Sequence, residues 1–340
     1  MILIIAHHYV VNSGLIEVMR QNPITTKSLY LYLFGMWGKT GINCFILITG
    51  FFMCQSRITL RKFTKLVFWV LFYRIVIYLI FCAFGYSDFS ILSVARKLWP
   101  IYDITDGFTS CFLVFFLTIP FLNILIQNMS KRQHTLLLVL SLFIYSIWAK
   151  MPYISVNMNY VIWFDILYLI SSYIRIYGVF EGVSHKKWGW LTLLSILLAM
   201  SSVIVILLLN KPKNAYYLVS DSNAILAVVV SICAFMYFKS YPMKYHKWIN
   251  SVGASTFGVL LIHAQSDTMR QWLWKDTLNN VGMYNQGGVI YIHSIVSVLG
   301  IFIICSIIDQ LRLKYLETPL FNALDKYMAK RNNKFIFEWT

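Results

Sequence analysis

Charged residues are scarce in this sequence. Asp, Glu, Lys and Arg make up 12% of its 340 residues, whereas hydrophobic residues make up 59%. A soluble domain carries roughly a quarter charged residues and about half apolar ones. A chain with the balance seen here has too little polar surface to cover a globule. The composition therefore argues against a soluble enzyme and a disordered chain, and it predicts a membrane protein with several spans.

Cysteine pairs and the common nucleotide and metal motifs are also missing. The six cysteines form no CxxC pair and lie within or beside apolar runs, so we expect small buried side chains rather than a disulfide framework. The sequence has no P-loop, GxGxxG, HExxH or GxSxG motif and no Asp-rich patch for a metal–diphosphate donor. These absences argue against an ATPase, a zinc protease and a nucleotide-sugar glycosyltransferase, and no metal is expected.

Acidic residues are few, so the formal net charge is strongly positive. The chain has 29 Lys and Arg against 13 Asp and Glu, which gives +16. On a soluble protein this excess would suggest nucleic acid as a partner. On a membrane protein its first explanation is the enrichment of Lys and Arg in cytoplasmic loops. We therefore expect no nucleic-acid partner.

Ten apolar runs approach the length of about 20 residues that a helix needs to cross the hydrocarbon core. All of them should be helical, because lipid offers no hydrogen-bond partner to an open backbone. The predicted fold class is therefore all-α and polytopic. The fifth and ninth runs are the shortest of the set, which comprises residues 1–16, 36–54, 66–84, 108–127, 135–149, 160–180, 188–209, 221–238, 251–264 and 289–308.

The positions of the basic residues predict the orientation of these spans. With the N-terminus inside, 17 Lys and Arg fall in inner segments and 10 in outer segments, while Arg74 and Arg175 fall within spans. Each inner loop contributes to the excess, as the positive-inside rule requires. We therefore predict that both termini are cytoplasmic.

The first apolar run and the segment after the last span lead to separate predictions. The first apolar run, 1–11, is only about half a span long and no basic residue precedes it, so we expect the sequence to start partway along a helix. No cleavage pattern follows this run, so we expect no removable signal peptide. We assign 1–308 to one transmembrane domain and 309–340 to a short basic cytoplasmic tail.

Histidines inside the predicted spans are candidate catalytic residues. An ionisable group in a membrane is costly, and the pKa of histidine suits proton transfer near neutral pH. His7 and His8 lie together in the first span, where adjacent side chains point about 100° apart. His263 closes the ninth span before Asp267 and Arg270. All three can alternatively be interfacial residues at helix ends, and for His293 in the tenth span a structural role is the better interpretation.

Three other charged residues lie in the spans. Arg74 is near the middle of the third span and Asp165 is in the sixth, so the two side chains can neutralise each other across the bundle. Arg175 is close to the inner end of the sixth span and can instead extend to lipid phosphates. We consider Arg74 for cofactor binding, and Asp165, Arg175 and Arg270 for substrate binding.

The segment that follows the second span is the densest cationic stretch of the chain. Arg57, Arg61 and Lys65 recur every four residues and so share one helical face, with Lys62 beside them. Such a face suits a phosphorylated cytosolic ligand such as a nucleotide or coenzyme A. The alternative is a topology signal in contact with lipid headgroups.

Six stretches in order along the chain resemble the acyltransferase-3 family of integral membrane acyltransferases. Three of these stretches close predicted spans: the first span closes with histidine, the second with a Gly-Phe pair and the ninth with Leu-Ile-His. The stretches are MILIIAHHY (1–9), NCFILITGFF (43–52), PFLN (120–123), LYLISSYIR (167–175), STFGVLLIH (255–263) and IDQLR (308–312).

The resemblance implies an activity and a donor. Members of this family move an acyl group, usually acetyl, from cytosolic acyl-coenzyme A to a hydroxyl of a glycan at or beyond the outer face. The implied donor here is acetyl-coenzyme A, and the implied acceptor is a capsule or exopolysaccharide or a lipid-linked glycan. The family motif Arg–x10–His places its histidine at His8, with His7 as the alternative, and its arginine would precede Met1. The tyrosine that the family has before Leu-Ile-His is Leu260 here.

Two other functions compete with this one. A transporter or flippase of lipid-linked sugar would also show many spans and a few buried charges, although the sequence has no inverted repeat. A non-catalytic remnant would explain the lack of the motif arginine. The abundance of Ile, Asn, Lys, Tyr and Phe predicts a bacterial plasma membrane as the location. The oligomeric state stays open.

Overall fold

A computed structural model describes residues 1–101, 104, 107–151 and 156–330, without the side chains of 328–330. These residues form helices and connections, with no strand among them. The all-α prediction is therefore confirmed for the part of the chain that is described. The last ten residues of the predicted tail, 331–340, lie outside it.

Six helical segments are long and apolar enough to cross a membrane. The bent pair α1 and α2, which turns by 54°, makes a seventh if it counts as one span. Each coincides with one of the ten predicted runs. The segments are α1 (Ile2–Val11) with α2 (Leu15–Gln21), α3 (Thr26–Gly35) with α4 (Gly38–Met53), α5 (Leu60–Ala83), α7 (Phe108–Asn128), α8 (Lys131–Leu142) extended to Lys150, α10 (His185–Leu208), and α16 (Val289–Arg312) continued by α17 (Thr318–Lys330).

The other three predicted runs are helical but shorter or more polar. One is α9 (Tyr160–Tyr177), which carries Asp165 and Arg175. A second is α11 (Ile225–Ser240), which has 16 residues. The third is divided at Ser255 into α12 (Lys247–Ala254) and α13 (Thr256–His263). By length and composition the described helices therefore give six or seven spans rather than ten.

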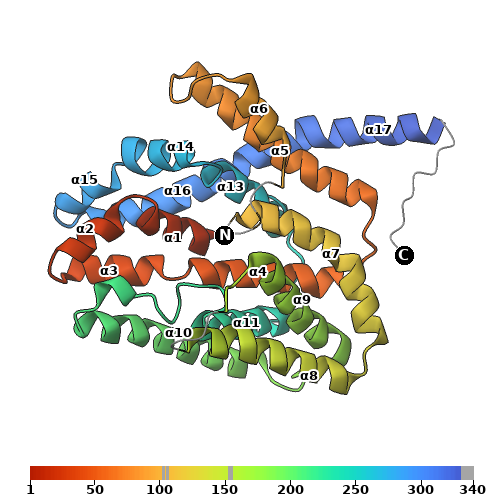
Figure 1. Ribbon diagram of the computed structural model, residues 1–340, viewed down its shortest axis with the longest axis horizontal. Helices are drawn as coiled ribbons and strands as arrows, with labels where there is room; N and C mark the ends of the chain where they lie inside the picture. The colour runs from red at the N-terminus through yellow and green to blue at the C-terminus, as the bar shows by residue number, and fades with distance from the viewer. Residues whose placement is uncertain (102–103, 105–106, 152–155, 331–340) are drawn as a thin grey trace.

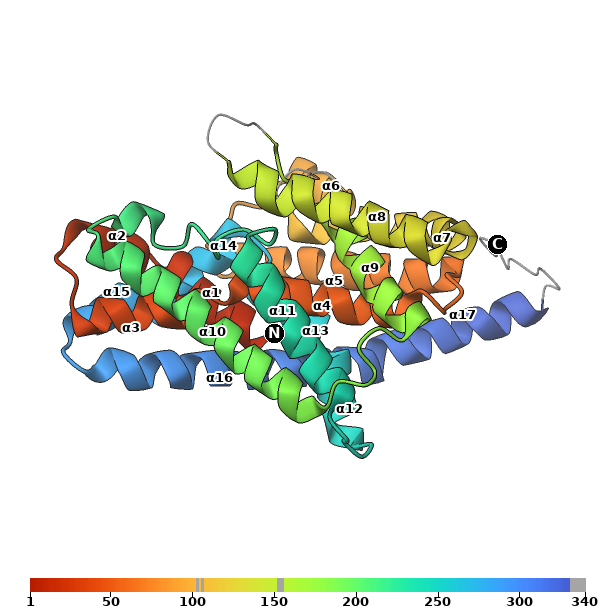
Figure 2. The ribbon, with the colours of Figure 1, turned by 90° about the horizontal axis from the view of Figure 1, so that it is seen from below.

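Three short helices lie outside the predicted runs. They are α6 (Ile91–Leu98), α14 (Asp267–Arg270) and α15 (Asn280–Asn285). Figure 1 shows α6 in a projecting hairpin that follows α5, and α17 as an arm that extends from the bundle. Figure 2 shows α10 and α11 crossing the same face of the molecule side by side.

Helix α1 lies at the centre, between α3–α4 on one side and α16 on the other (Figure 1). Its contact with α3–α4 is made through glycines three residues apart. Gly35 faces Val10, Gly38 faces His7 and Gly41 faces Ile4, so the two helices run antiparallel in a fixed register. Small residues of this kind let helix backbones approach closely within a membrane.

The closest of these contacts leaves no room for a methyl group. A Cβ atom on Gly38 would lie 2.4 Å from the Cγ atom of His7 and 2.6 Å from its Cβ atom. These atoms lie next to the α1 backbone and cannot swing away. The glycine stripe therefore determines how deep α1 sits, and with it the position of both histidines on α1.

Gly38→Ala should lower the thermal unfolding temperature of the detergent-purified protein, because the added methyl group forces α1 outward. Overpacking of this kind costs about 1–3 kcal/mol. Gly300→Ala, on α16, is the matched control, since a Cβ there meets nothing within 4 Å. It should leave the unfolding temperature unchanged or raise it, because alanine favours a helix over glycine. Equal unfolding temperatures for the two variants would contradict the close packing at Gly38.

Candidate active site

Two histidines that are 255 residues apart in the sequence meet in the bundle. Nδ1 of His8, on α1, lies 3.0 Å from Nε2 of His263, the last residue of α13. His263 is buried, with 1% of its surface exposed. The structure thus brings together two of the three histidines that the sequence marks as catalytic candidates.

The hydrogen bonds of this pair set its tautomers. His263 Nδ1 lies 2.6 Å from the carbonyl oxygen of Val259, and because a carbonyl only accepts, this nitrogen carries the proton. In neutral His263, Nε2 is then the acceptor, so His8 Nδ1 donates to it. His8 Nε2 is left with a lone pair, which is the form that a general base or nucleophile requires.

His7 has a different partner. Its Nδ1 donates to the carbonyl oxygen of Gly35 at 2.7 Å, at the end of α3. This carbonyl lies where the helix breaks between α3 and α4, so the imidazole supplies a donor that the helix no longer provides. His7 lines the same cavity as His8, but its hydrogen bond indicates a role in holding α1 against α3.

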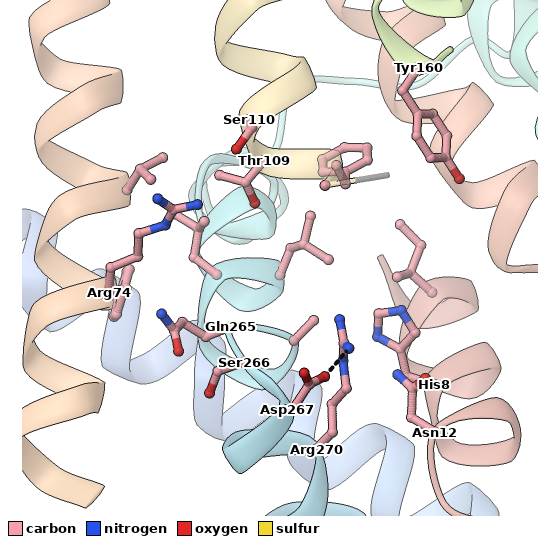
Figure 3. Close-up of a pocket in the computed structure, with 18 of the residues that line it drawn as sticks. His8, Asn12, Arg74, Thr109, Ser110, Tyr160, Gln265, Ser266, Asp267 and Arg270 are labelled. Atoms are coloured by element: carbon pink, nitrogen blue, oxygen red, sulfur yellow. Dashed lines mark hydrogen bonds and ion pairs between the residues drawn. The ribbon is translucent and has the colours of Figure 1, made fainter. Parts of the chain in front are cut away.

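A cavity of about 1020 Å³ opens in front of His8. Helix ends from many parts of the chain meet around it, and Figure 3 shows the side chains of α1, α5, α7, α9 and α14 that point into it. Its polar wall includes Asn12, Ser110, Tyr160, Gln265 and Ser266. The described lining is also strongly cationic, with Lys39, Arg74, Arg96, Lys97 and Arg270 against a single carboxylate, Asp267.

Three of the cavity cations have described partners of different kinds. Arg270 pairs with Asp267 at 2.6 Å (Figure 3), and Lys39 donates to the hydroxyl of Tyr160 at 2.6 Å. The ammonium of Lys97 sits over the ring of Tyr78, 4.7 Å from its centre. Burial, followed by the nearby charge of Arg74, lowers the pKa of Lys97 from its ordinary value. Among the described residues that line it, the cavity therefore carries an excess of positive charge.

The predicted coenzyme A cluster lies elsewhere. Arg61 forms an ion pair with Asp325 of α17, Lys65 Nζ lies 4.0 Å from Glu317, and Lys62 donates to the Arg57 carbonyl at 2.7 Å. None of these four residues lines the cavity, whereas Arg74 does. The reason is distance along α5, because 13 helical residues separate Arg61 from Arg74 and span about 20 Å. Arg74 therefore lies apart from the other four residues, and the assignment of all five to coenzyme binding stays a prediction.

The remaining predicted residues also divide into those that line the cavity and those that lie elsewhere. Of the three substrate candidates, only Arg270 lines the cavity. Asp165 accepts a hydrogen bond from Thr118 at 2.8 Å and does not pair with Arg74, which donates to the Trp99 carbonyl at 3.0 Å. Arg175 donates to Gln55 at 3.0 Å near the opposite helix ends. The predicted neutralisation of Arg74 by Asp165 is therefore wrong.

Sequence reasoning missed Lys39, Arg96, Lys97 and Tyr160. A signal for the three cations was present, since they are basic residues in segments assigned to the outside, against the general bias. Only folding could show that they converge on the cavity that contains His8. Among the described residues, no group of three or more His, Cys, Asp or Glu side chains is placed to hold a metal ion.

A buried charge network lies under α13 and bears on His263. Asp309 of α16 accepts hydrogen bonds from Trp69 at 2.9 Å, Tyr73 at 2.8 Å and Arg312 at 2.9 Å. Arg312 also donates to Glu317 at 2.5 Å. The carboxyl group of Asp309 packs directly against Gly258 of α13, where a Cβ would lie 2.2 Å from its Cγ atom. The network thus supports the helix that ends in His263.

The fold and the site together define a helical membrane protein with a histidine pair facing a cationic cavity. Comparison with protein families agrees with this class. The model of the acyltransferase-3 family, described as an acyltransferase domain, matches residues 1–308. The chain belongs to this family and is a membrane acyltransferase. No curated protein and no solved structure matched the chain.

Asp309→Asn should destabilise the protein strongly, because it leaves Arg312 buried with one fewer anionic partner. Breaking a buried pair by removing one partner costs about 3–5 kcal/mol. The matched control is Asp325→Asn, which breaks the half-exposed pair with Arg61 and should cost at most about 1 kcal/mol. Thermal unfolding in detergent measures both, and similar losses would show that the Asp309 network does not support the bundle.

Proposed function

We propose that this acyltransferase moves an acetyl group from cytosolic acetyl-coenzyme A to a hydroxyl of a cell-surface polysaccharide, in a bacterial plasma membrane. The observation that carries the proposal is the hydrogen-bonded pair His8–His263, which leaves His8 Nε2 unprotonated beside the cavity. Transfer from a thioester to a hydroxyl needs a group that takes up the hydroxyl proton, and an imidazole in this tautomer can do so.

The proposed orientation places both termini inside. The cavity is lined by Phe108 and Tyr160, the first residues of α7 and α9, and this orientation directs both helix starts outward. Lys39 joins them from the middle of the segment α3–α4. The cationic segment Arg57–Lys65 is at the opposite end of α4 and α5, on the inner side. Ten crossings follow if α9, α11 and the pair α12–α13 each cross the membrane as well.

The proposed reaction is a direct displacement at the acetyl carbonyl. The acceptor hydroxyl transfers its proton to His8 Nε2 while its oxygen forms a bond to the carbonyl carbon. The carbon–sulfur bond then breaks, and the proton returns from His8 to the sulfur of coenzyme A. During the step His8 is an imidazolium whose Nδ1–H stays bonded to His263, which holds the ring in position.

The proposed donor site is the basic segment on the inner side. Arg57, Arg61, Lys62 and Lys65 provide the positive charge that the coenzyme phosphates require. Two of these cations already have carboxylate partners, Asp325 and Glu317, near or on α17. Coenzyme phosphates would replace these partners, and the pantetheine arm would carry the thioester along α5 towards His8.

His8→Ala should reduce acetyl-coenzyme A turnover by purified protein by a factor of about 10²–10⁴, the usual contribution of a general base. His263→Ala should reduce it as well, because the His8 ring loses its acceptor. The control is His293→Asn, which keeps a hydrogen-bonding group near the Tyr9 hydroxyl and lies outside the cavity lining. In cells, His8→Ala should remove the O-acetyl signals from NMR spectra of the surface polysaccharide. Turnover and spectra unchanged by His8→Ala would refute the proposed base.

The orientation can be tested with single cysteines in a chain whose own six cysteines are replaced by serine. Lys213→Cys, between α10 and α11, should react with a membrane-impermeant maleimide in intact cells. Lys244→Cys, after α11, should react only after the cells are opened. Both positions are exposed, so the reaction depends on the side of the membrane and not on burial. The reverse pattern would place the cavity on the cytosolic side.

A further inference from the structure

A second cavity, the α10–α11 cavity, has a volume of about 420 Å³ and lies between the start of α10 and the end of α11. Figure 2 shows these two helix ends converging near α12. The first residue of α9, Tyr160, lines the cavity with His8, whereas the end of α9 leads into α10. The α10–α11 cavity therefore lies at the opposite end of the bundle. Ligand sites typically have volumes of about 300–1,000 Å³, so this cavity has room for a ligand group.

Aromatic rings form much of the wall of the α10–α11 cavity. The ring of Tyr237 packs against Gly189 of α10, where a Cβ atom would lie 3.3 Å from its Cε2 atom. The rings of Tyr241 and His185 meet edge to face, with their centres 5.7 Å apart. Trp190 lines the cavity from α10 and is 72% exposed. Tyrosine and tryptophan collect at the membrane–water interface, where one end of the side chain is in the acyl region and the other is wet.

The chain around the α10–α11 cavity is basic. Lys186 lines the cavity, and Lys187 follows it on α10. Lys239, Lys244 and Lys247 lie between the last turn of α11 and the first residue of α12. In the part of the chain that the structure describes, none of these five ammonium groups forms an ion pair with a carboxylate. The cavity therefore attracts an anion that the described residues do not supply.

One face of α10 changes from basic to apolar along the helix. Lys186 is followed at intervals of four, three and four residues by Trp190, Leu193 and Leu197, so all four share this face. We call the last three the apolar stripe of α10. Leu193 and Leu197 are 45% and 50% exposed, on a helix long and apolar enough to cross a membrane. In such a helix the ammonium of Lys186 lies at headgroup depth, and the stripe faces the acyl chains.

We propose that the α10–α11 cavity binds a phospholipid with an anionic headgroup. Its phosphate contacts the ammonium of Lys186 and the hydroxyl of Tyr241, and one acyl chain lies along the apolar stripe of α10. Basic pockets between membrane helices bind anionic headgroups in this way. The occupant is a lipid and not a free phosphate compound, because the basic cavity continues into an exposed apolar stripe. The inference goes beyond acyl transfer, since no residue of this cavity lines the one with His8.

The test titrates dioleoyl phosphatidylglycerol into the full-length protein in a nonionic detergent and counts bound lipids by native mass spectrometry. Lys186→Glu should weaken the tightest binding event about tenfold or more, because an attraction to the phosphate becomes a repulsion. The matched control is Lys187→Glu, which makes the same change of charge one position away, exposed and outside the cavity lining. It should change the affinity far less, since solvent screens an exposed charge that does not touch the lipid. Equal affinities of Lys186→Glu and the unmodified protein, or equal losses in the two variants, would overturn the proposal.

A second pair of variants tests the acyl chain. Leu193→Gln places a polar group on the apolar stripe of α10 and should weaken the same binding event about fivefold, because the chain loses apolar contact. Leu198→Gln is the matched control, since Leu198 is 52% exposed on a different face of α10. It should leave the affinity unchanged. Equal affinities of the two variants would show that no chain lies along the stripe and would contradict the proposed site.

Three other ligands identify the occupant. Dioleoyl phosphatidylcholine has the same chains without a net charge and should bind about tenfold more weakly. Glycerophosphoglycerol, the headgroup without its chains, should not displace phosphatidylglycerol, because it cannot use the apolar stripe. Coenzyme A should not displace it either, and displacement that Lys186→Glu abolishes would assign the cavity to the acyl donor. Each of the three opposite results would overturn the proposal of an anionic phospholipid.

Discussion

The contact of α1 with the glycines of α3–α4 is the constraint on which the site depends. Because Gly35, Gly38 and Gly41 have no side chain, the α1 backbone comes close enough for His7 to reach the Gly35 carbonyl. That approach also brings His8 within hydrogen-bond distance of His263. A membrane interior offers no hydrophobic force to press helices together, so close packing of this kind must hold them.

The second histidine, His263, is also positioned by a close contact at a glycine, but here the glycine packs against a charged group. Gly258 lets α13 rest on the carboxyl group of Asp309, and three donors fix that carboxyl in turn. Desolvating an acid and an arginine is costly. Here three donors share one carboxyl oxygen, Oδ1, while the buried Oδ2 has no hydrogen-bond partner among the described residues. One side of the histidine pair is therefore held by van der Waals contact and the other by buried charge.

Much of the fold could be predicted from the sequence, because apolar length and the lack of backbone partners in lipid dictate helices. His8 and His263 could be identified from motifs, since both close an apolar run. The hydrogen bond from His7 to the Gly35 carbonyl at the break between α3 and α4 could not, because it joins residues 28 positions apart that only folding brings together. The sequence also did not show that Arg74 lines the cavity while Arg61 does not. Both residues are on α5, but they are about 20 Å apart along the helix. Loop charges such as Lys97 reveal their partners only after the chain has folded.

The register between α1 and α3–α4 has a consequence for how this chain tolerates changes of length. From one glycine contact to the next, the residue number rises by three on α3–α4 and falls by three on α1. The contacts therefore depend on the spacing within each helix and not on the length of the chain that connects the helices. Insertions or deletions in the connection around α2 leave all three contacts intact. One residue inserted between Ile4 and Val10 rotates one part of α1 against the other by about 100°, so at least one glycine then faces the wrong side chain.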